Sequence, residues 1–202
     1  MTLPNVTLFP QARMRLHIFE PRYRQMLEEV LQSRRMITIA MRKPGSSREI
    51  PFTVAGLGLV RVCLEQPDGT SILILEGLSR VELLNTVRRV PFRINRIRPL
   101  PTPNRDSVTI DALMAKVRDL VSERIKQGLK TRPNAPKSHS IKEIIAYLDK
   151  LSDPDQVADL VSCALLPGPV ERQTILETVE IEPRLKHLIH FLMAEITQNR
   201  KK

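Results

Sequence analysis

The chain has 202 residues, of which 42% are hydrophobic and 27% are charged, so it can form one large or two small domains around a buried core. Its two cysteines, Cys63 and Cys163, lie far apart between apolar neighbours, which is neither a metal-binding nor a disulfide spacing and predicts a reduced, cytoplasmic protein. The longest apolar runs are a few residues, so we expect no signal peptide and no membrane as a partner.

The net charge of +10 indicates an anionic partner, and its distribution along the chain is uneven. Residues 1–105 carry 17 basic and 8 acidic side chains, whereas residues 106–202 carry 15 and 14. The densest basic stretch, residues 88–105, contains six arginines and no acidic residue, so it is either a phosphate-binding stripe or a solvated edge. These arginines are Arg88, Arg89, Arg93, Arg96, Arg98 and Arg105.

Alternation of apolar residues predicts a strand-rich first half. Glu20 and Pro21 mark the start of the one helix expected there, over residues 21–33. The strands are expected over residues 13–18, 36–41, 52–66, 70–76, 79–87 and 91–98. Glycines inside or between these strands indicate bulges or bends in a closing sheet, so we expect a small coiled sheet or barrel. These glycines are Gly56, Gly58 and Gly77.

A proline-rich interruption over residues 98–106 precedes a helical second half. Apolar residues at helical spacing predict a helix over residues 111–129, and Ser140 with Glu143 form a capping box that opens a second helix. Further helices are expected after Asp153–Pro154, over residues 170–179, and after Pro183. The sequence therefore predicts two domains, residues 1–105 and 106–202.

No motif with catalytic chemistry is evident. Residues 43–49 lack the second glycine and the Lys-Ser/Thr pair of a phosphate-binding loop. His187 and His190 are three apart on a predicted amphipathic helix, which is more typical of a solvated face than of a zinc site with its further ligands. We therefore expect no catalytic residues, no metal and no cofactor.

Several separate segments resemble, in order and spacing, the N-terminal domain of Lon proteases. They are "LPNVTLFPQARMRLHIFEPRYRQMLEEVL", "FTVAGLGLVRVCLEQPDGTSILILEGLSRVEL" and "DPDQVADLVSCALLPGPVERQTILETVEIEPRLKHLI". The resemblance implies an α+β fold, a PUA-like pseudobarrel followed by a C-terminal α-helical bundle. Lon proteases continue into ATPase and serine-lysine peptidase domains, and this chain ends at Lys202, so we expect a stand-alone, non-enzymatic substrate-recognition domain.

The resemblance implies a module of protein quality control that binds unfolded or exposed apolar polypeptide, as an adaptor for a protease or chaperone. Candidate contacts are Leu16, Phe19 and Tyr23, which surround a strand-to-helix junction; the alternative is that they fill the core of the barrel.

An alternative function is RNA binding, which PUA domains perform, through Arg88, Arg89, Arg93, Arg96 and Arg98. Only one aromatic residue, Phe92, lies among these arginines, so base stacking is poorly provided for and polypeptide is the favoured ligand.

Overall fold

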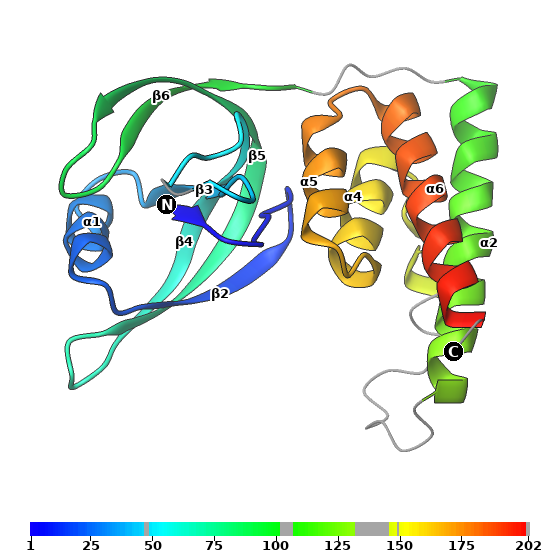
Figure 1. The fold of residues 1–202 in the computed structure, drawn as a ribbon, viewed down its shortest axis with the longest axis horizontal. Coiled ribbons are helices and arrows are strands. Elements are labelled where there is room, and N and C mark those ends of the chain that lie inside the picture. Colours follow the sequence, from blue (N-terminus) through cyan, green and yellow to red (C-terminus); the bar gives the residue numbers. More distant parts are fainter. Residues whose placement is uncertain (47–48, 102–106, 132–145, 149, 201–202) are drawn as a thin grey trace. The chain divides into compact units, whose positions relative to one another are not determined.

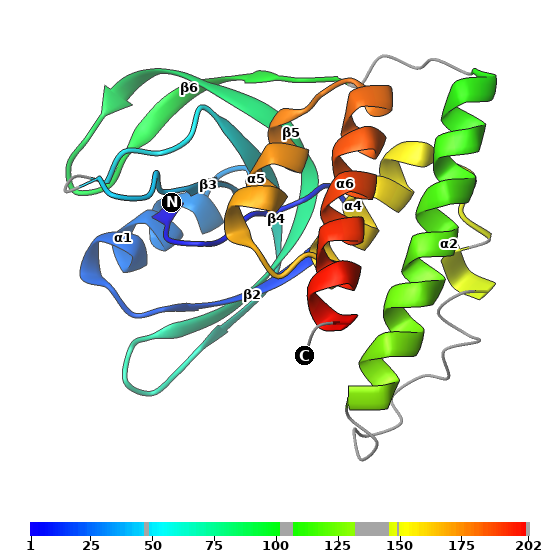
Figure 2. The same ribbon diagram turned by 45° about the vertical axis from the view of Figure 1, so that its right-hand side comes forward.

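The computed structural model describes residues 1–46, 49–101, 107–131, 146–148 and 150–200. The chain forms two compact units, Met1–Pro101 and Thr102–Lys202. Strands and one helix make up the first unit, and helices make up the second (Figure 1 and Figure 2). The expected α+β fold is confirmed. The predicted boundary between residues 105 and 106 and the capping box of Ser140 and Glu143 lie outside the described residues.

The first unit follows the predicted order of elements with two differences. Its elements are β1 (Thr2–Leu3), β2 (Arg13–Ile18), α1 (Pro21–Leu31), β3 (Met36–Met41), β4 (Val54–Glu65), β5 (Ser71–Arg88) and β6 (Ile94–Pro99). The short strand β1 was not predicted. The two strands predicted over residues 70–76 and 79–87 are a single strand, β5, because Gly77 continues the pairing with β4 opposite Gly58.

Strand β5 organises the sheet, whose order is β1-β3-β4-β5 with both β2 and β6 on the far side of β5. Its first part pairs with β2 from Ser71 to Glu76, and its second part pairs with β6 from Val81 to Arg88. The register between β4 and β5 shifts at Leu57/Gly58 and at Val60/Val62. Such irregularities add twist and bend to a sheet, which allows this one to curl into a barrel.

The segment before β2, residues 7–10, crosses the sheet at its glycines, and we call it the crossing segment. A methyl group built on Gly56 would fall on the carbonyl oxygen of Leu8, and one built on Gly77 on the carbonyl oxygen of Phe9. Leu8 and Phe9 are fully buried. Hydrogen bonds from Gln11 N to Gly77 O, at 2.7 Å, and from Gly77 N to Ala12 O, at 2.8 Å, fix the end of the crossing.

Helix α1 closes the barrel with one apolar face. Its buried residues Tyr23, Met26 and Leu27 join a core that includes Ile37, Leu73 and Phe92. Pro21 occupies the first turn, where a helix needs no donated hydrogen bond from it. The start of α1 is therefore where the sequence predicts it.

The second unit contains four named helices within the described residues: α2 (Val108–Thr131), α4 (Pro154–Leu165), α5 (Pro169–Glu177) and α6 (Ile181–Arg200). Asp153 caps α4 by accepting from Asp155 N at 2.9 Å. The predicted start of the last helix, after Pro183, is wrong, because α6 begins at Ile181. Pro183 lies in its first turn, where its missing N–H leaves no hydrogen bond unmade.

A buried arginine joins three elements of the helical unit. Arg184, on α6, is fully buried, and its guanidinium donates to the Thr178 carbonyl at 2.7 Å and to the Val179 carbonyl. The same group forms an ion pair with Asp155 and lies 3.8 Å from the buried carboxylate of Asp159. Asp159, which faces this arginine, is buried on α4, whereas the next residue, Leu160, is 38% exposed.

The crossing segment generates the first prediction. Gly56→Ala and Gly77→Ala each place a methyl group on backbone atoms that have no rotamer to change, so each should lower the free energy of unfolding by about 1–3 kcal/mol or more. The new methyl group of Gly58→Ala comes too close only to the Leu8 Cδ2 methyl, at 2.7 Å, which can rotate, and its contacts with the Glu76 and Ile37 carbonyl oxygens, at 3.5 and 3.6 Å, are ordinary, so this variant should cost less. Urea unfolding of the three variants tests this order, and a larger loss at Gly58 would contradict it.

The second prediction concerns the buried arginine. Arg184→Leu removes the cation from the buried Asp159 and should lower the free energy of unfolding by about 3–5 kcal/mol. Lys186→Leu is the matched control, because Lys186 forms an exposed pair with Glu182 at 2.7 Å on the same helix and should cost less than about 0.5 kcal/mol. If urea unfolding shows the same loss of unfolding free energy in both variants, the buried pair does not stabilise the helical unit more than the exposed pair does.

Candidate functional site

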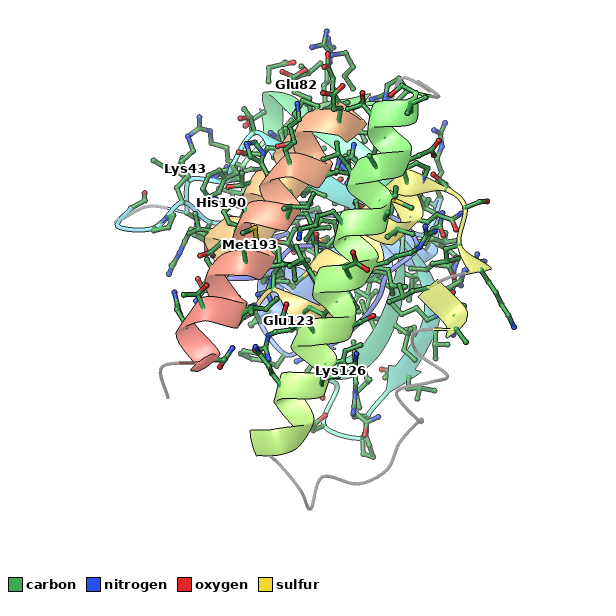
Figure 3. The ribbon with its side chains drawn as sticks, turned by 90° about the vertical axis from the view of Figure 1, so that its right-hand side faces the viewer. Lys43, Glu82, Glu123, Lys126, His190 and Met193 are labelled. Carbon is green, nitrogen blue, oxygen red and sulfur yellow. The ribbon has the colours of Figure 1, made fainter. Side chains whose placement is uncertain are left out.

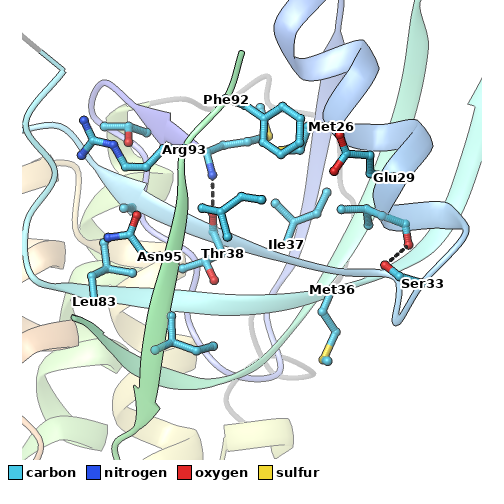
Figure 4. A pocket seen from close by; sticks show the side chains of 16 residues that line it. Met26, Glu29, Ser33, Met36, Ile37, Thr38, Leu83, Phe92, Arg93 and Asn95 are labelled. Carbon is cyan, nitrogen blue, oxygen red and sulfur yellow. Dashed lines mark hydrogen bonds between the residues drawn. The ribbon is translucent and has the colours of Figure 1, made fainter. Parts of the chain in front are cut away.

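A cleft of about 400 Å³ opens in the first unit between β6 and the strands at the other side of the sheet. Ile94 and Ile97 line it from β6, and Met36 and Ile37 line it from β3, with Met26 of α1 beneath. Figure 4 shows Arg93 and Asn95 beside β6, with Ile37 and Thr38 on the strand beyond. The cleft exists because β1 and β6 lie on opposite sides of the sheet and the barrel curls without pairing them.

One side of this cleft offers an unpaired strand edge. Among the described residues β6 pairs only with β5, so its other edge has main-chain groups without a strand partner. Ile94 and Ile97 remain 38% and 37% exposed there. A strand edge of this kind is able to accept an added strand through main-chain hydrogen bonds.

Charged groups gather where β6 begins. The Arg22 guanidinium binds both carboxylate oxygens of Glu49, at 2.8 and 2.6 Å, and these bonds lower the pKa of the Glu49 carboxyl and raise the pKa of Arg22. Arg93 donates to the Glu49 carbonyl at 2.9 Å. Burial, with Arg93 and Arg22 nearby, lowers the pKa of the Met1 amino group to about 5, and this group donates to Thr38 O at 2.6 Å.

The three predicted peptide contacts occupy different environments. Tyr23 is 5% exposed and belongs to the core, where burial raises its pKa and its hydroxyl donates to the Thr2 carbonyl at 3.4 Å. Leu16 packs against the same core from β2. Phe19 is 59% exposed, with its ring 5.7 Å from that of His17. The structure thus separates one exposed ring from two residues that fill the barrel, and their role in peptide binding remains a prediction.

The predicted arginine stripe is partly neutralised. Arg88 pairs with Glu29 at 2.9 Å and lies over the Phe92 ring at 4.3 Å, and Arg98 pairs with Glu82. Arg89 and Arg96 are exposed. Glu29 comes from α1, which is distant in sequence from the stripe, and Glu82 comes from β5, whose last residue is Arg88.

The two histidines of α6 lie at its surface. His187 Nδ1 is 3.2 Å from the Thr178 hydroxyl, and the His190 ring packs edge-on against Phe191. Figure 3 shows His190 and Met193 on the same helix, and Met193 is 50% exposed. In the part of the chain that the structure describes, no three metal-ligating side chains come together. None of the described helices is long and apolar enough to cross a bilayer.

Sequence reasoning did not identify the cleft. Its residues come from α1, β1, β3, β5 and β6, and their separation along the chain hides their proximity. The available signal was "INRIR", where Ile94 and Ile97 stand among arginines in a strand. Apolar residues in such a charged edge strand belong either to the core or to the surface, and Ile94 and Ile97 lie partly exposed at the surface.

The chain is similar to Lon sequences and structures over almost its entire length. A model of the "ATP-dependent protease La (LON) substrate-binding domain" matches residues 1–194. The Lon protease of Rhizobium meliloti is 26% identical over 201 residues, 98% of this chain and 24% of that protein. The Lon protease of Phenylobacterium zucineum is 32% identical over 126 residues, which are 62% of this chain and 15% of that one. The chain thus spans about a quarter or less of the length of these relatives.

Solved structures agree on the fold. The N-terminal domain of the Mycobacterium avium complex Lon protease superposes with a TM-score of 0.74, 18% identity and coverage of 96% of both chains. A Lon N-terminal domain protein from Xanthomonas campestris gives a TM-score of 0.66 and 16% identity, covering 94% of this chain and 96% of the other. The family model, which covers nearly the whole sequence, decides the classification: the chain belongs to the LON substrate-binding domain family.

Proposed function

We propose that the cleft beside β6 binds extended, apolar segments of unfolded polypeptide. The observation that carries this proposal is the unpaired edge of β6 next to an apolar cleft of about 400 Å³. An added strand would take its affinity from main-chain hydrogen bonds and place alternate side chains in the cleft. The substrate-binding role of the family supports a polypeptide as the ligand.

The lining of the cleft suits a binder of many sequences. Met26 and Met36 contribute flexible, polarisable side chains that adapt to differently shaped partners. Main-chain pairing with β6 does not depend on which side chains the guest carries. The exception is proline, which is excluded wherever the guest must donate a backbone N–H. A site of this kind fits exposed segments of unfolded proteins better than a single folded partner.

The role proposed for this domain is therefore to bind a polypeptide without catalysing a reaction on it. In this proposal it holds a client polypeptide and acts in protein quality control, as the adaptor for a protease or chaperone that acts on the client. The relatives that carry the name Lon protease are about four times longer than the matched region, which leaves room in them for such a partner activity.

The arginine stripe is less suited to binding RNA than the cleft is to binding polypeptide. Arg88 and Arg98 form ion pairs with Glu29 and Glu82, which leaves fewer of the predicted arginines to bind phosphates. The Phe92 ring is 5% exposed and covered by the Arg88 guanidinium, so it offers no platform for a base.

The third prediction is that Ile97→Asp weakens binding of a neutral apolar peptide by about tenfold or more, because a carboxylate would be buried against the guest strand. The probe has the six-residue length of β6 and is labelled at its amino end and amidated at its carboxyl end. Fluorescence anisotropy gives its dissociation constant. Moderate salt should change this constant little, because apolar burial is not screened.

Val62→Asp is the matched control. Val62 is 36% exposed on β4, close to the 37% of Ile97, and it does not line the cleft. This variant should bind the peptide as the unchanged protein does, and circular dichroism checks that both variants fold. Equal weakening by the two substitutions, or a tighter, steeply salt-dependent binding of labelled RNA, would overturn the proposal.

A further inference from the structure

A small recess adjoins the cleft at the point where β6 begins. Its volume is about 70 Å³, which is enough for one small group such as a carboxylate. Arg22, Arg89 and Arg93 line it together with Glu49. The recess and the cleft share Phe92 and Arg93 in their walls, so a strand lying in the cleft ends at the recess.

The recess carries more positive than negative charge. The Glu49 carboxylate is already bound by both terminal nitrogens of Arg22, and Arg22 also reaches Glu20 at 2.8 Å. Arg93 makes one hydrogen bond, to a backbone carbonyl, which does not neutralise its charge. Within the residues described, Arg89 has no hydrogen bond or ion pair. Arg93 lies near enough to Glu49 to help lower the pKa of its carboxyl, but three arginines against one glutamate leave the lining of the recess with a net positive charge.

The direction of the strands decides which end of a guest would reach these arginines. Phe92 and Arg93 immediately precede Ile94, the first residue of β6, so the recess lies at the amino-terminal end of that strand. A guest that pairs antiparallel with β6, as β5 does on the other edge, places its carboxyl end there.

We propose that Arg89 and Arg93 in this recess bind the C-terminal carboxylate of the polypeptide whose last residues lie against β6. This inference rests on the proposed function of the cleft. Guanidinium groups hold carboxylates through charge-assisted hydrogen bonds, which are stronger than those between neutral groups. The domain thereby prefers apolar chain ends over internal apolar segments.

The test compares three labelled peptides of one apolar sequence, ending in a free carboxylate, in an amide, or in an aspartate followed by an amide. Anisotropy titrations on the whole chain should give the free acid a dissociation constant about tenfold below that of the amide. The affinity of the aspartyl amide should exceed that of the simple amide by clearly less than tenfold. Its carboxylate is on a side chain, which projects from the side of the strand and not from its end. If the free acid and the aspartyl amide bind equally tightly, the recess does not select the C-terminal carboxylate, and the proposal is wrong.

Arg89→Gln should bring the ratio between acid and amide close to one. Arg96→Gln is the control, since Arg96 is an exposed arginine of β6 that lines neither the cleft nor the recess, and it should keep the tenfold ratio. If the amide binds and the acid binds no better, the carboxylate recess is wrong and the cleft proposal stands. If neither peptide binds, the cleft proposal is wrong and this inference falls with it.

Discussion

The contact between the crossing segment and the glycines of β4 and β5 is the constraint on which the barrel depends. The first 18 residues begin beside β3, pass over the sheet at Gly56 and Gly77, and end paired with β5. One continuous segment therefore ties the two sides of the sheet together. Any side chain at these glycines would push the backbone of Leu8 and Phe9 away from the sheet, and the burial of both residues would be lost.

The same arrangement explains why the barrel has an opening. The crossing segment holds β1 to β3 and β2 to the first part of β5, while the second part of β5 continues alone with β6. Nothing in the described first unit pairs with the outer edge of β6. The cleft is the space that results, and it combines an apolar interior, from the barrel core, with a charged entrance, from the arginines before and within β6.

The regular elements of this fold were accessible from sequence, whereas its long-range contacts were not. Alternation located β2 and β3, and Pro21 and Asp153 marked helix starts, because these signals act over a few residues. The glycines were interpreted as bends, and their second role, to admit another segment of backbone, depends on Leu8 and Phe9, which lie far away in the sequence. Arg184 and Asp159 stand within segments that resemble the Lon family, yet their buried pairing could not be deduced without the packing of α4 on α6. The cleft could not be predicted for the same reason, since five elements contribute to it.

The charged residues of β6 have a consequence for the behaviour of the domain at high concentration. A strand edge that stays open for a guest is equally open to the same edge of another copy, and such pairing leads to aggregation. Arg96 would then bring an exposed positive charge to the edge of the second molecule, whereas the charge of Arg98 is paired with Glu82. Pro99 would interrupt the ladder because it has no N–H to donate. The exposed charge of Arg96 and the missing N–H of Pro99 therefore disfavour pairing between two copies of this chain along β6.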